Sequence, residues 1–294
     1  MSQGLTASLK DTFRQGVHGL YHLLLKKFHL IYLREKGRRL FEQSHPPLVK
    51  LVDFDGVQFA IYIQTHGAIE DHILRHGNWS GDLLTLTDHF ITPGSVIIEI
   101  GANIGFESLY YAKKHPGCVV HSYEPGSYAF HSLSVSKAYH QLDNLKVFKL
   151  GVGDQNQLLE IASPTAASVN KGLGSLKQNV DLDDSYQKES IQVVTLDSHF
   201  QDERTVALLK IDTQGFEWNV LQGAAKTIAK HRPAILFEHE DHYHPDPLAV
   251  RRLIADFFAE ASYDLYRPDP DILYPLDFRN APHCHTDVLA LPRK

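Results

Sequence analysis

An apolar run leads directly into a glycine-containing turn at residues 96–106, Val-Ile-Ile-Glu-Ile-Gly-Ala-Asn-Ile-Gly-Phe. Gly101 and Gly105 permit the backbone to approach a ligand closely, where the N-terminus of a following helix offers free N–H donors. Dinucleotide-binding turns usually read G-x-G-x-x-G, whereas the middle position here is Asn103. Glu99 precedes the first glycine by two residues, where a carboxylate repels phosphate and can receive an ammonium group. We therefore expect a ligand that is cationic at this end.

A second acid follows the next apolar run, in the sequence His-Ser-Tyr-Glu-Pro. Glu124 lies 23 residues after Gly101, and its carboxylate can accept hydrogen bonds from both hydroxyls of a ribose. S-Adenosylmethionine combines an ammonium group, a carboxylate for the helix N-terminus and a ribose, so we predict it as the cofactor. Leu-Gly-Val-Gly-Asp then closes a third strand and offers Val152 and Asp154 as neighbours of the adenine, although such a string is also typical of a plain turn.

A third block, residues 207–224, begins with the apolar strand Ala-Leu-Leu-Lys-Ile and continues with Asp-Thr-Gln-Gly-Phe-Glu. Asp212 ends this strand and is predicted at the carboxyl edge of the sheet, where open α/β folds hold their ligands. Lys210 is a catalytic candidate in the same strand. The alternative is that it forms an ion pair with a nearby acid.

Strand-length and helix-length segments alternate beyond Pro93, which predicts an α/β fold with a mostly parallel sheet covered on both faces. The predicted strands are Val96–Ile100, Val119–Tyr123, Leu145–Leu150, Val206–Ile211, Ala234–Phe237, Tyr263–Arg267 and Asp287–Leu291. The predicted helices are Phe106–Lys114, Tyr128–Tyr139, Glu217–Lys230 and Pro247–Ala261.

Composition shifts divide the chain into two predicted parts, 1–46 and 47–294, at a break in His45-Pro46-Pro47. Within the second part we expect a β-hairpin at 49–64, turning at Asp55-Gly56, and a Rossmann-like core at 93–294. Residues 162–190 are rich in Gly, Ser, Lys and Asp and interrupt the alternation, so we expect an insertion or lid beside the site.

Charge separates the same two parts. The chain of 294 residues has a formal net charge of -6, but residues 1–46 stand at +5 and residues 47–294 at -11. The net negative charge of residues 47–294 argues against nucleic acid as a substrate. Apolar residues between Val17 and Tyr32 recur on one helical face, with basic residues opposite and following. This segment is expected either to lie on an anionic membrane or partner, or to pack on its own catalytic domain.

Cysteine usage and hydropathy indicate the compartment. Cys118 and Cys284 are the only cysteines and have no C-x-x-C spacing, so neither a disulfide framework nor a zinc knuckle is indicated. Gln15–Leu25 is too short and too interrupted to span a bilayer. We expect a cytoplasmic protein, with residues 1–46 as a candidate for peripheral contact at the inner face of a membrane.

Five ordered sequence blocks resemble the FkbM family of S-adenosylmethionine-dependent methyltransferases, over about residues 49–290. These blocks are Glu-Ile-Gly-Ala-Asn-Ile-Gly, Tyr-Glu-Pro, Val-Val-Thr-Leu-Asp-Ser (193–198), Leu-Leu-Lys-Ile-Asp-Thr-Gln-Gly-Phe-Glu and Arg-Pro-Ala-Ile-Leu-Phe-Glu (232–238). The resemblance implies a class I methyltransferase fold of seven strands with the last strand antiparallel. It also implies O-methylation of a hydroxyl on a small metabolite, a sugar or glycan, or a polyketide-like acceptor.

The resemblance assigns roles to individual positions. Those implied as cofactor contacts are Glu99, Gly101, Ala102, Asn103, Gly105, Glu124 and Pro125. Those implied at the methyl end of the site are Asp212, Thr213, Gln214 and Gly215. The family usually has an acid where this chain has Gln214, which puts any charged role of that position in doubt.

Methyl transfer to a hydroxyl needs a group that removes the hydroxyl proton. The sequence Phe-Glu-His-Glu-Asp-His-Tyr-His-Pro-Asp follows the fifth strand, and His239 or His242 is a suitable base near neutral pH. Alternatively, Glu238 and Asp212 hold a divalent ion that acidifies the hydroxyl. A third interpretation is that these polar residues simply begin a surface loop. His283-Cys284-His285 is expected to be a loop rather than a ligand set.

Two other functional classes share some of these features. A nicotinamide-dependent oxidoreductase would have the same strand, turn and ribose-binding acid, but the missing middle glycine and the added Glu99 argue against it. A non-catalytic S-adenosylmethionine-binding or scaffold protein would have the same pocket without turnover.

Overall fold

A computed structural model describes residues 47–64, 67–164, 186–269, 271–281 and 285–293. They belong to one compact unit, Pro47–Lys294. The predicted amphipathic helix in 1–46 and the loop at His283-Cys284 lie outside the described residues. No helix among the described residues is long and apolar enough to cross a membrane.

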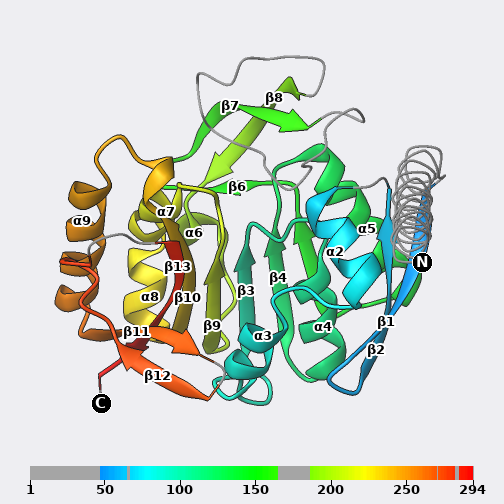
Figure 1. Cartoon of the computed structure of the whole chain (residues 1–294), viewed down its shortest axis with the longest axis horizontal. Coiled ribbons are helices and arrows are strands. Elements are labelled where there is room, and N and C mark those ends of the chain that lie inside the picture. Colours follow the sequence, from blue (N-terminus) through cyan, green and yellow to red (C-terminus); the bar gives the residue numbers. More distant parts are fainter. Residues whose placement is uncertain (1–46, 65–66, 165–185, 270, 282–284, 294) are drawn as a thin grey trace, which may run out of the picture. The chain divides into compact units, whose positions relative to one another are not determined.

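The central sheet has eight strands in the order β12-β11-β13-β10-β9-β3-β4-β5 (Figure 1). The strands are β3 (Val96–Ile100), β4 (Val119–Tyr123), β5 (Leu145–Phe148), β9 (Val206–Ile211), β10 (Ala234–Glu240), β11 (Tyr263–Asp269), β12 (Ile272–Pro275) and β13 (His285–Pro292). Neighbours from β5 to β10 are parallel, and β13 inserts antiparallel between β10 and β11. The α/β class and the antiparallel last strand are confirmed. The count of seven was one too few, because β12 extends the edge as a hairpin partner of β11.

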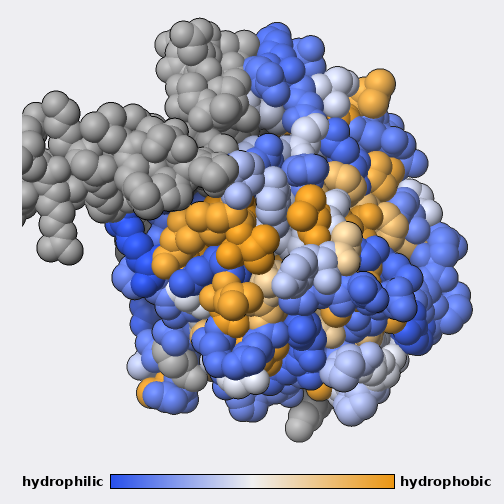
Figure 2. Space-filling model, turned by 90° about the vertical axis from the view of Figure 1, so that its right-hand side faces the viewer, coloured by the Kyte–Doolittle hydropathy of each residue, from blue (hydrophilic) through white to orange (hydrophobic). Residues whose placement is uncertain are grey.

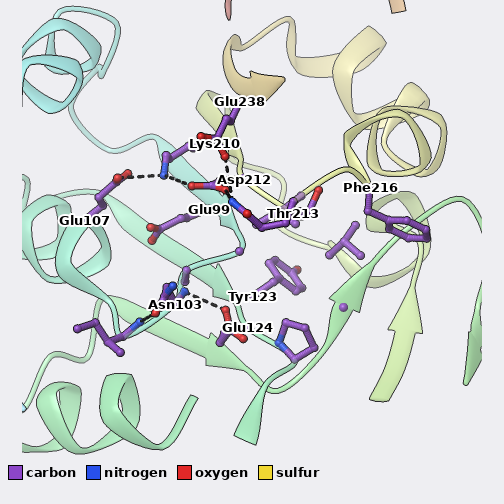
Figure 3. Close-up of a pocket in the computed structure, with 18 of the residues that line it drawn as sticks. Glu99, Asn103, Glu107, Tyr123, Glu124, Lys210, Asp212, Thr213, Phe216 and Glu238 are labelled. Carbon is purple, nitrogen blue, oxygen red and sulfur yellow. Dashed lines mark hydrogen bonds and ion pairs between the residues drawn. The ribbon is translucent and has the colours of Figure 1, made fainter. Parts of the chain in front are cut away.

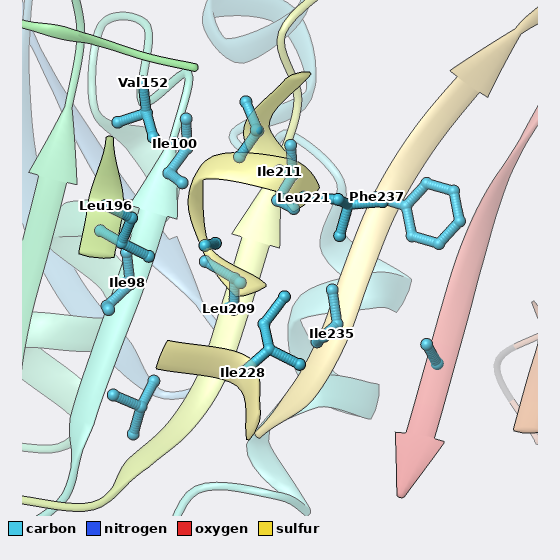
Figure 4. Packing of buried hydrophobic residues seen from close by; sticks show 14 of the residues in the cluster. Ile98, Ile100, Val152, Leu196, Leu209, Ile211, Leu221, Ile228, Ile235 and Phe237 are labelled. Atoms are coloured by element: carbon cyan, nitrogen blue, oxygen red, sulfur yellow. The ribbon is translucent and has the colours of Figure 1, made fainter. Parts of the chain in front are cut away.

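The inner strands are apolar on both faces because each face is covered. Alternate residues of β3 belong to two separate core clusters, with Ile98 and Ile100 on one face and Ile97 on the other. Figure 4 shows the first face, where side chains of β3, β9 and β10 pack against Leu221 and Ile228. This burial explains why the strands read as nearly continuous hydrophobic runs in the sequence.

Helices cover the two faces of the sheet. They are α4 (Phe106–Lys114), α5 (Ser127–His140), α6 (Leu196–His199), α7 (Glu217–Gly223), α8 (Ala225–His231) and α9 (Pro247–Glu260), with a short 3-10 helix η1 (Asp241–Tyr243) before α9. The single helix predicted at 217–230 is interrupted at Ala224, which separates α7 from α8. Asp246 caps α9 by accepting a bond from the Ala249 N–H, and Pro247 occupies the first helical turn, where proline is tolerated.

The expected hairpin is present as β1 (Leu48–Phe54) and β2 (Val57–Ile63), with Asp55 and Gly56 both at positive φ in the turn. It packs on the outside of α4 and α5, and the Tyr62 N–H donates to Ser136 Oγ at 2.8 Å. The side of the molecule that carries this hairpin is largely hydrophilic with scattered apolar areas (Figure 2). Helices α2 (Ala68–His76) and α3 (Gly81–Asp88) follow the hairpin and were not predicted.

A small second sheet, β6-β8-β7, lies above the carboxyl ends of the central strands at the top of Figure 1. It consists of β6 (Gly151–Val152), β7 (Gln157–Pro164) and β8 (Tyr186–Val194). The two ends of the predicted insertion at 162–190 are therefore paired strands, while residues 165–185 lie outside the described part of the chain. Glu189 of β8 accepts bonds from the Ser127 N–H, at 3.2 Å, and from Ser163 Oγ, at 2.6 Å, which ties this sheet to the start of α5.

Candidate active site

A cavity of about 410 Å³ opens at the carboxyl ends of β3, β4, β9 and β10 (Figure 3). One part is acidic and is lined by Glu99, Glu107, Glu124, Asp212, Glu238 and Glu240. Another part is apolar and is lined by Tyr123, Val152, Ile161, Ile191, Val193 and Phe216. The site thus lies at the sheet edge where open α/β folds hold ligands, and its size suits a small molecule.

The turn after β3 has the left-handed backbone at Gly101 (φ 86°), Asn103 (φ 50°) and Gly105 (φ 90°). A Cβ on Gly101 would lie 1.8 Å from the backbone oxygen of Asp212, and one on Gly105 would lie 2.2 Å from Leu133 Cδ1. The glycines are therefore required by positive φ and by packing against protein, and both also line the cavity. Asparagine tolerates this conformation, and Asn103 Oδ1 accepts from the Ile104 N–H at 2.7 Å.

Glu124 is held by two backbone donors at the end of β4. Its Oε2 accepts from the Asn103 N–H at 2.9 Å (Figure 3), and its Oε1 accepts from the Gly126 N–H at 2.8 Å. Burial raises the pKa of Glu124 to about 7 against the lowering effect of these two bonds. The carboxylate lines the cavity as predicted, together with Ala102 and Pro125.

Glu99 is 2% exposed and points from β3 into the acidic part of the cavity. Its Oε2 accepts hydrogen bonds from the Ser108 and Ser122 hydroxyls. Burial, and next the nearby Glu107 carboxylate, raise the pKa of Glu99 to about 8. A cation placed beside such a buried acid would strongly stabilise its ionised form.

Lys210 lies between two carboxylates (Figure 3). Its Nζ is 2.9 Å from Glu107 Oε1 and 3.7 Å from Asp212 Oδ2. Burial favours the neutral amine, but the charges of Glu107 and Asp212 outweigh it and hold the pKa of Lys210 well above its ordinary value. The ion-pair interpretation is confirmed. Because Lys210 keeps its proton, it is not suited to accept one at neutral pH, and its catalytic role stays a prediction.

The Gln214 side chain connects the carboxyl groups of Asp212 and Glu238. Its Nε2 donates to Asp212 Oδ1 and to Glu238 Oε2, each at 3.0 Å, while its Oε1 accepts from the Tyr243 hydroxyl. Burial, and next the charge of Asp212, raise the pKa of Glu238 to about 9. Glu238 therefore retains its proton at neutral pH beside the Asp212 carboxyl.

His239 is not part of the cavity, which corrects its prediction as a base. The strand β10 continues to Glu240, so Glu238 and Glu240 face the cavity while His239 faces the other side. His239 is fully buried, packs against His244 and Phe278, and burial lowers its pKa to about 4. The second predicted histidine, His242, lines the cavity, and its Nδ1 is 2.9 Å from Glu240 Oε2.

The remaining predicted contacts divide into two groups. Val152 and Thr213 line the cavity. Asp154 and Gly215 do not: the Asp154 carboxylate is exposed and accepts from Asn219 Nδ2 at 3.2 Å. A Cβ on Gly215, which has φ 99°, would lie 2.6 Å from Tyr243 Cβ.

No group of three or more histidine, cysteine, aspartate or glutamate side chains in the described part of the chain has the arrangement to hold a metal ion. The Gln214 amide lies between Asp212 and Glu238, the pair suggested as metal ligands. The donor set therefore does not fit a divalent ion between these two acids.

Sequence reasoning missed Glu217 and Tyr243. Glu217 Oε1 accepts from the Thr213 N–H at 3.1 Å, the Gly215 N–H at 3.0 Å and the Thr213 hydroxyl, which fixes the turn after β9. An acid at the first position of a helix, directly after a glycine-containing turn, is the signal that could have identified Glu217. Tyr243 had no such signal, because its place depends on where β10 ends.

The sheet order, the antiparallel β13 and a ligand cavity at the carboxyl edge define a class I methyltransferase fold. The family model described as the methyltransferase FkbM domain matches residues 99–265, which is more than half of the chain. The chain therefore belongs to the FkbM methyltransferase family.

Two curated relatives share moderate identity with part of the chain. One is the 31-O-demethyl-FK506 methyltransferase FkbM of Streptomyces tacrolimicus, 29% identical over 45% of this chain and 60% of that protein. The other is methyltransferase 1 of Beauveria bassiana, 26% identical over 44% of this chain and 58% of that protein. The aligned region thus spans about three-fifths of the length of these relatives.

Solved structures with a similar arrangement are more distant. A methyltransferase FkbM of Methylobacillus flagellatus has 18% identity and a TM-score of 0.42, covering 67% of this chain and 43% of that one. A SAM-dependent O-methyltransferase of Thermotoga maritima has 12% identity and a TM-score of 0.41, covering 83% and 78%.

Proposed function

We propose that this protein is an S-adenosylmethionine-dependent O-methyltransferase. The observation that carries the proposal is that one cavity brings together the two acids suited to the cofactor, Glu99 and Glu124, and the acid pair Asp212 and Glu238. Glu99 and Glu238 lie in β3 and β10, and Glu124 and Asp212 directly follow β4 and β9, which are four neighbouring strands of the sheet.

The cavity suits the three parts of the cofactor. Glu99 would accept the ammonium group, and Glu124 would accept the ribose hydroxyls, since each carboxyl faces the cavity. The apolar part, which includes Val152 and Phe216, would enclose the adenine. When bound, S-adenosylmethionine supplies a methyl group on a positively charged sulfur, which is already activated for in-line displacement.

The chain's own task is then to hold the acceptor and take its proton. Asp212 would receive the hydroxyl proton as the acceptor oxygen forms its bond to the methyl carbon. Lys210 holds Asp212 in place through its ammonium group. Because Glu238 retains a proton at neutral pH, Asp212 is the member of the pair that would take the hydroxyl proton.

Other residues that line the cavity indicate what kind of acceptor fits. Ala68, Ile69 and Trp79 contribute an apolar side to the cavity, while Glu240 and Tyr243 contribute a polar side. A hydroxyl-bearing molecule with one apolar face, such as a sugar ring or a polyketide, matches both sides. The acidic lining disfavours phosphorylated or carboxylated acceptors.

Comparing cells with and without the gene by untargeted mass spectrometry tests the proposal, because the comparison does not require the acceptor to be identified beforehand. We expect a metabolite that is one methyl heavier in cells with the gene. Complementation with Asp212→Asn should lower that product about 100-fold or more, the usual effect of losing a general base. Full product formation by the variant would refute the role of Asp212.

A further inference from the structure

The Gln214 side chain is an uncharged link between the two acids of the site. Its two N–H donors are both used, one on Asp212 Oδ1 and one on Glu238 Oε2, each at 3.0 Å. Its carbonyl oxygen accepts from the Tyr243 hydroxyl. An amide turned by 180° would lose both bonds to the acids and present its oxygen to them.

Tyr243 is placed to prevent that turn. It follows β10 in η1 and packs directly over Gly215, where a Cβ would lie 2.6 Å from Tyr243 Cβ. Gln214 itself has φ 54°, a conformation that the surrounding turn imposes through the three bonds to Glu217. Neighbouring residues therefore hold both the backbone and the side chain of Gln214 in place.

We propose that Tyr243 is a positioning residue that acts through Gln214, aiming its two N–H donors at Asp212 and Glu238 so that the pair keeps one negative charge toward the acceptor. Its catalytic consequence rests on the function proposed above. The positioning itself does not, because it concerns the ligand-free protein.

The charged groups around Asp212 and Glu238 make the hydrogen bonds from Gln214 important for the pKa of Glu238. The charged and titratable groups around the pair are Lys210 on β9, Glu107 on α4, Glu124 after β4, Glu240 on β10, Asp287 on β13, Glu217 on α7 and Tyr243 itself. Most of them are acids, which favour the protonated form of the pair, whereas each amide donor aimed at the pair favours its ionised form. Without the amide donors, Glu238 would release its proton only at a higher pH.

The test is a carbon-13 NMR titration of the glutamate carboxyl groups in the ligand-free full chain, with the Glu238 signal assigned by Glu238→Gln. We expect wild-type Glu238 to titrate near pH 9, and Tyr243→Phe to move its midpoint upward by about one pH unit. Simple loosening of the site would admit water and move the midpoint downward instead.

Two further variants complete the test. Gln214→Met removes both donors at similar length and should reproduce the upward shift, which keeps the proposal testable if the tyrosine variant folds poorly. Tyr128→Phe is the matched control, since its hydroxyl donates to Glu70 Oε1 at 3.2 Å, outside the cavity lining. An unchanged or lowered midpoint in Tyr243→Phe and Gln214→Met would overturn the proposal. Failure of S-adenosylhomocysteine to bind would instead refute the proposed function and leave this result standing.

Discussion

At the scale of single residues, the proposed function assigns the recognition of the cofactor to Glu99 and Glu124. Both acids hold their protons more strongly than exposed glutamates, with pKa values of about 8 and about 7. A ligand ammonium group next to Glu99 stabilises the carboxylate, so cofactor binding and proton release are linked.

This linkage predicts a pH-dependent affinity for S-adenosylhomocysteine, which carries the same ammonium group and ribose. Because the ligand prefers the ionised form of Glu99, affinity should rise about tenfold between pH 6 and pH 8. Calorimetry in buffers of different ionisation enthalpy should also show proton release. Glu99→Gln should weaken binding and flatten this dependence, and a wild-type affinity that is constant over this range would contradict the role of Glu99.

The sequence was sufficient to predict that Glu99 and Glu124 lie at the site, because each is at or next to the end of a short apolar strand. The prediction of a base among the histidines was less successful for His239. The expected strand ended at Phe237, whereas β10 runs to Glu240. Because successive side chains of a strand point to opposite faces, Glu238 and Glu240 face the cavity and His239 does not. Gln214 and Tyr243 depend on contacts across 29 positions of sequence, which no local pattern reports.

Asp88 joins three elements at the scale of helices and strands. Its Oδ1 is 2.8 Å from His115 Nε2, and its Oδ2 is 2.5 Å from the Tyr110 hydroxyl and 2.8 Å from Lys114 Nζ. Lys114 also pairs with Asp55 in the turn of the β1–β2 hairpin. The cluster therefore links α3, α4 and the hairpin.

Removing this carboxylate should destabilise the fold. Burial alone would raise the pKa of Asp88, but hydrogen bonds from His115, Lys114 and Tyr110 hold it below 3.8. Its stabilisation is therefore present above pH 3.8 and is lost as the pH falls through the folded-state value. We expect Asp88→Asn to lower the free energy of unfolding by about 1–3 kcal/mol at pH 7, measured by urea denaturation.

A matched control is Asp264→Asn, which removes an exposed ion pair with Arg293. Because both partners are about half exposed, the expected loss there is only about 0–1 kcal/mol. The Asp88 account would fail if its variant were no less stable than this control, or if its deficit were as large at pH 3 as at pH 7.

Elements with a long apolar run or a clear amphipathic period were predicted with bounds close to those observed, as for β3, β9 and α4. The elements that were missed have weaker local signals. Helices α2 and α3 fall between the predicted hairpin and the predicted core, in a segment for which no element was expected. Strands β7 and β8 pair across residues 165–185, so their pairing is not a local property of the sequence.

At the scale of the whole molecule, residues 47–294 carry a net charge of -11, and the fold brings several of their acids together at one edge of the sheet. Five parallel strands from β5 to β10 direct their carboxyl ends to the cavity, and Glu99, Asp212 and Glu238 lie at or near those ends. The excess of negative charge suits a cofactor that is cationic at its sulfur and its amino group.

Binding of S-adenosylhomocysteine to the purified protein is the most direct test of the central claim that this cavity is a cofactor site. Calorimetry at pH 8 should show one equivalent of S-adenosylhomocysteine bound, no binding of NAD, and at least about tenfold weaker binding in Glu124→Ala, since the variant loses two ribose hydrogen bonds. Binding of NAD without S-adenosylhomocysteine, or an unchanged affinity in Glu124→Ala, would contradict the account.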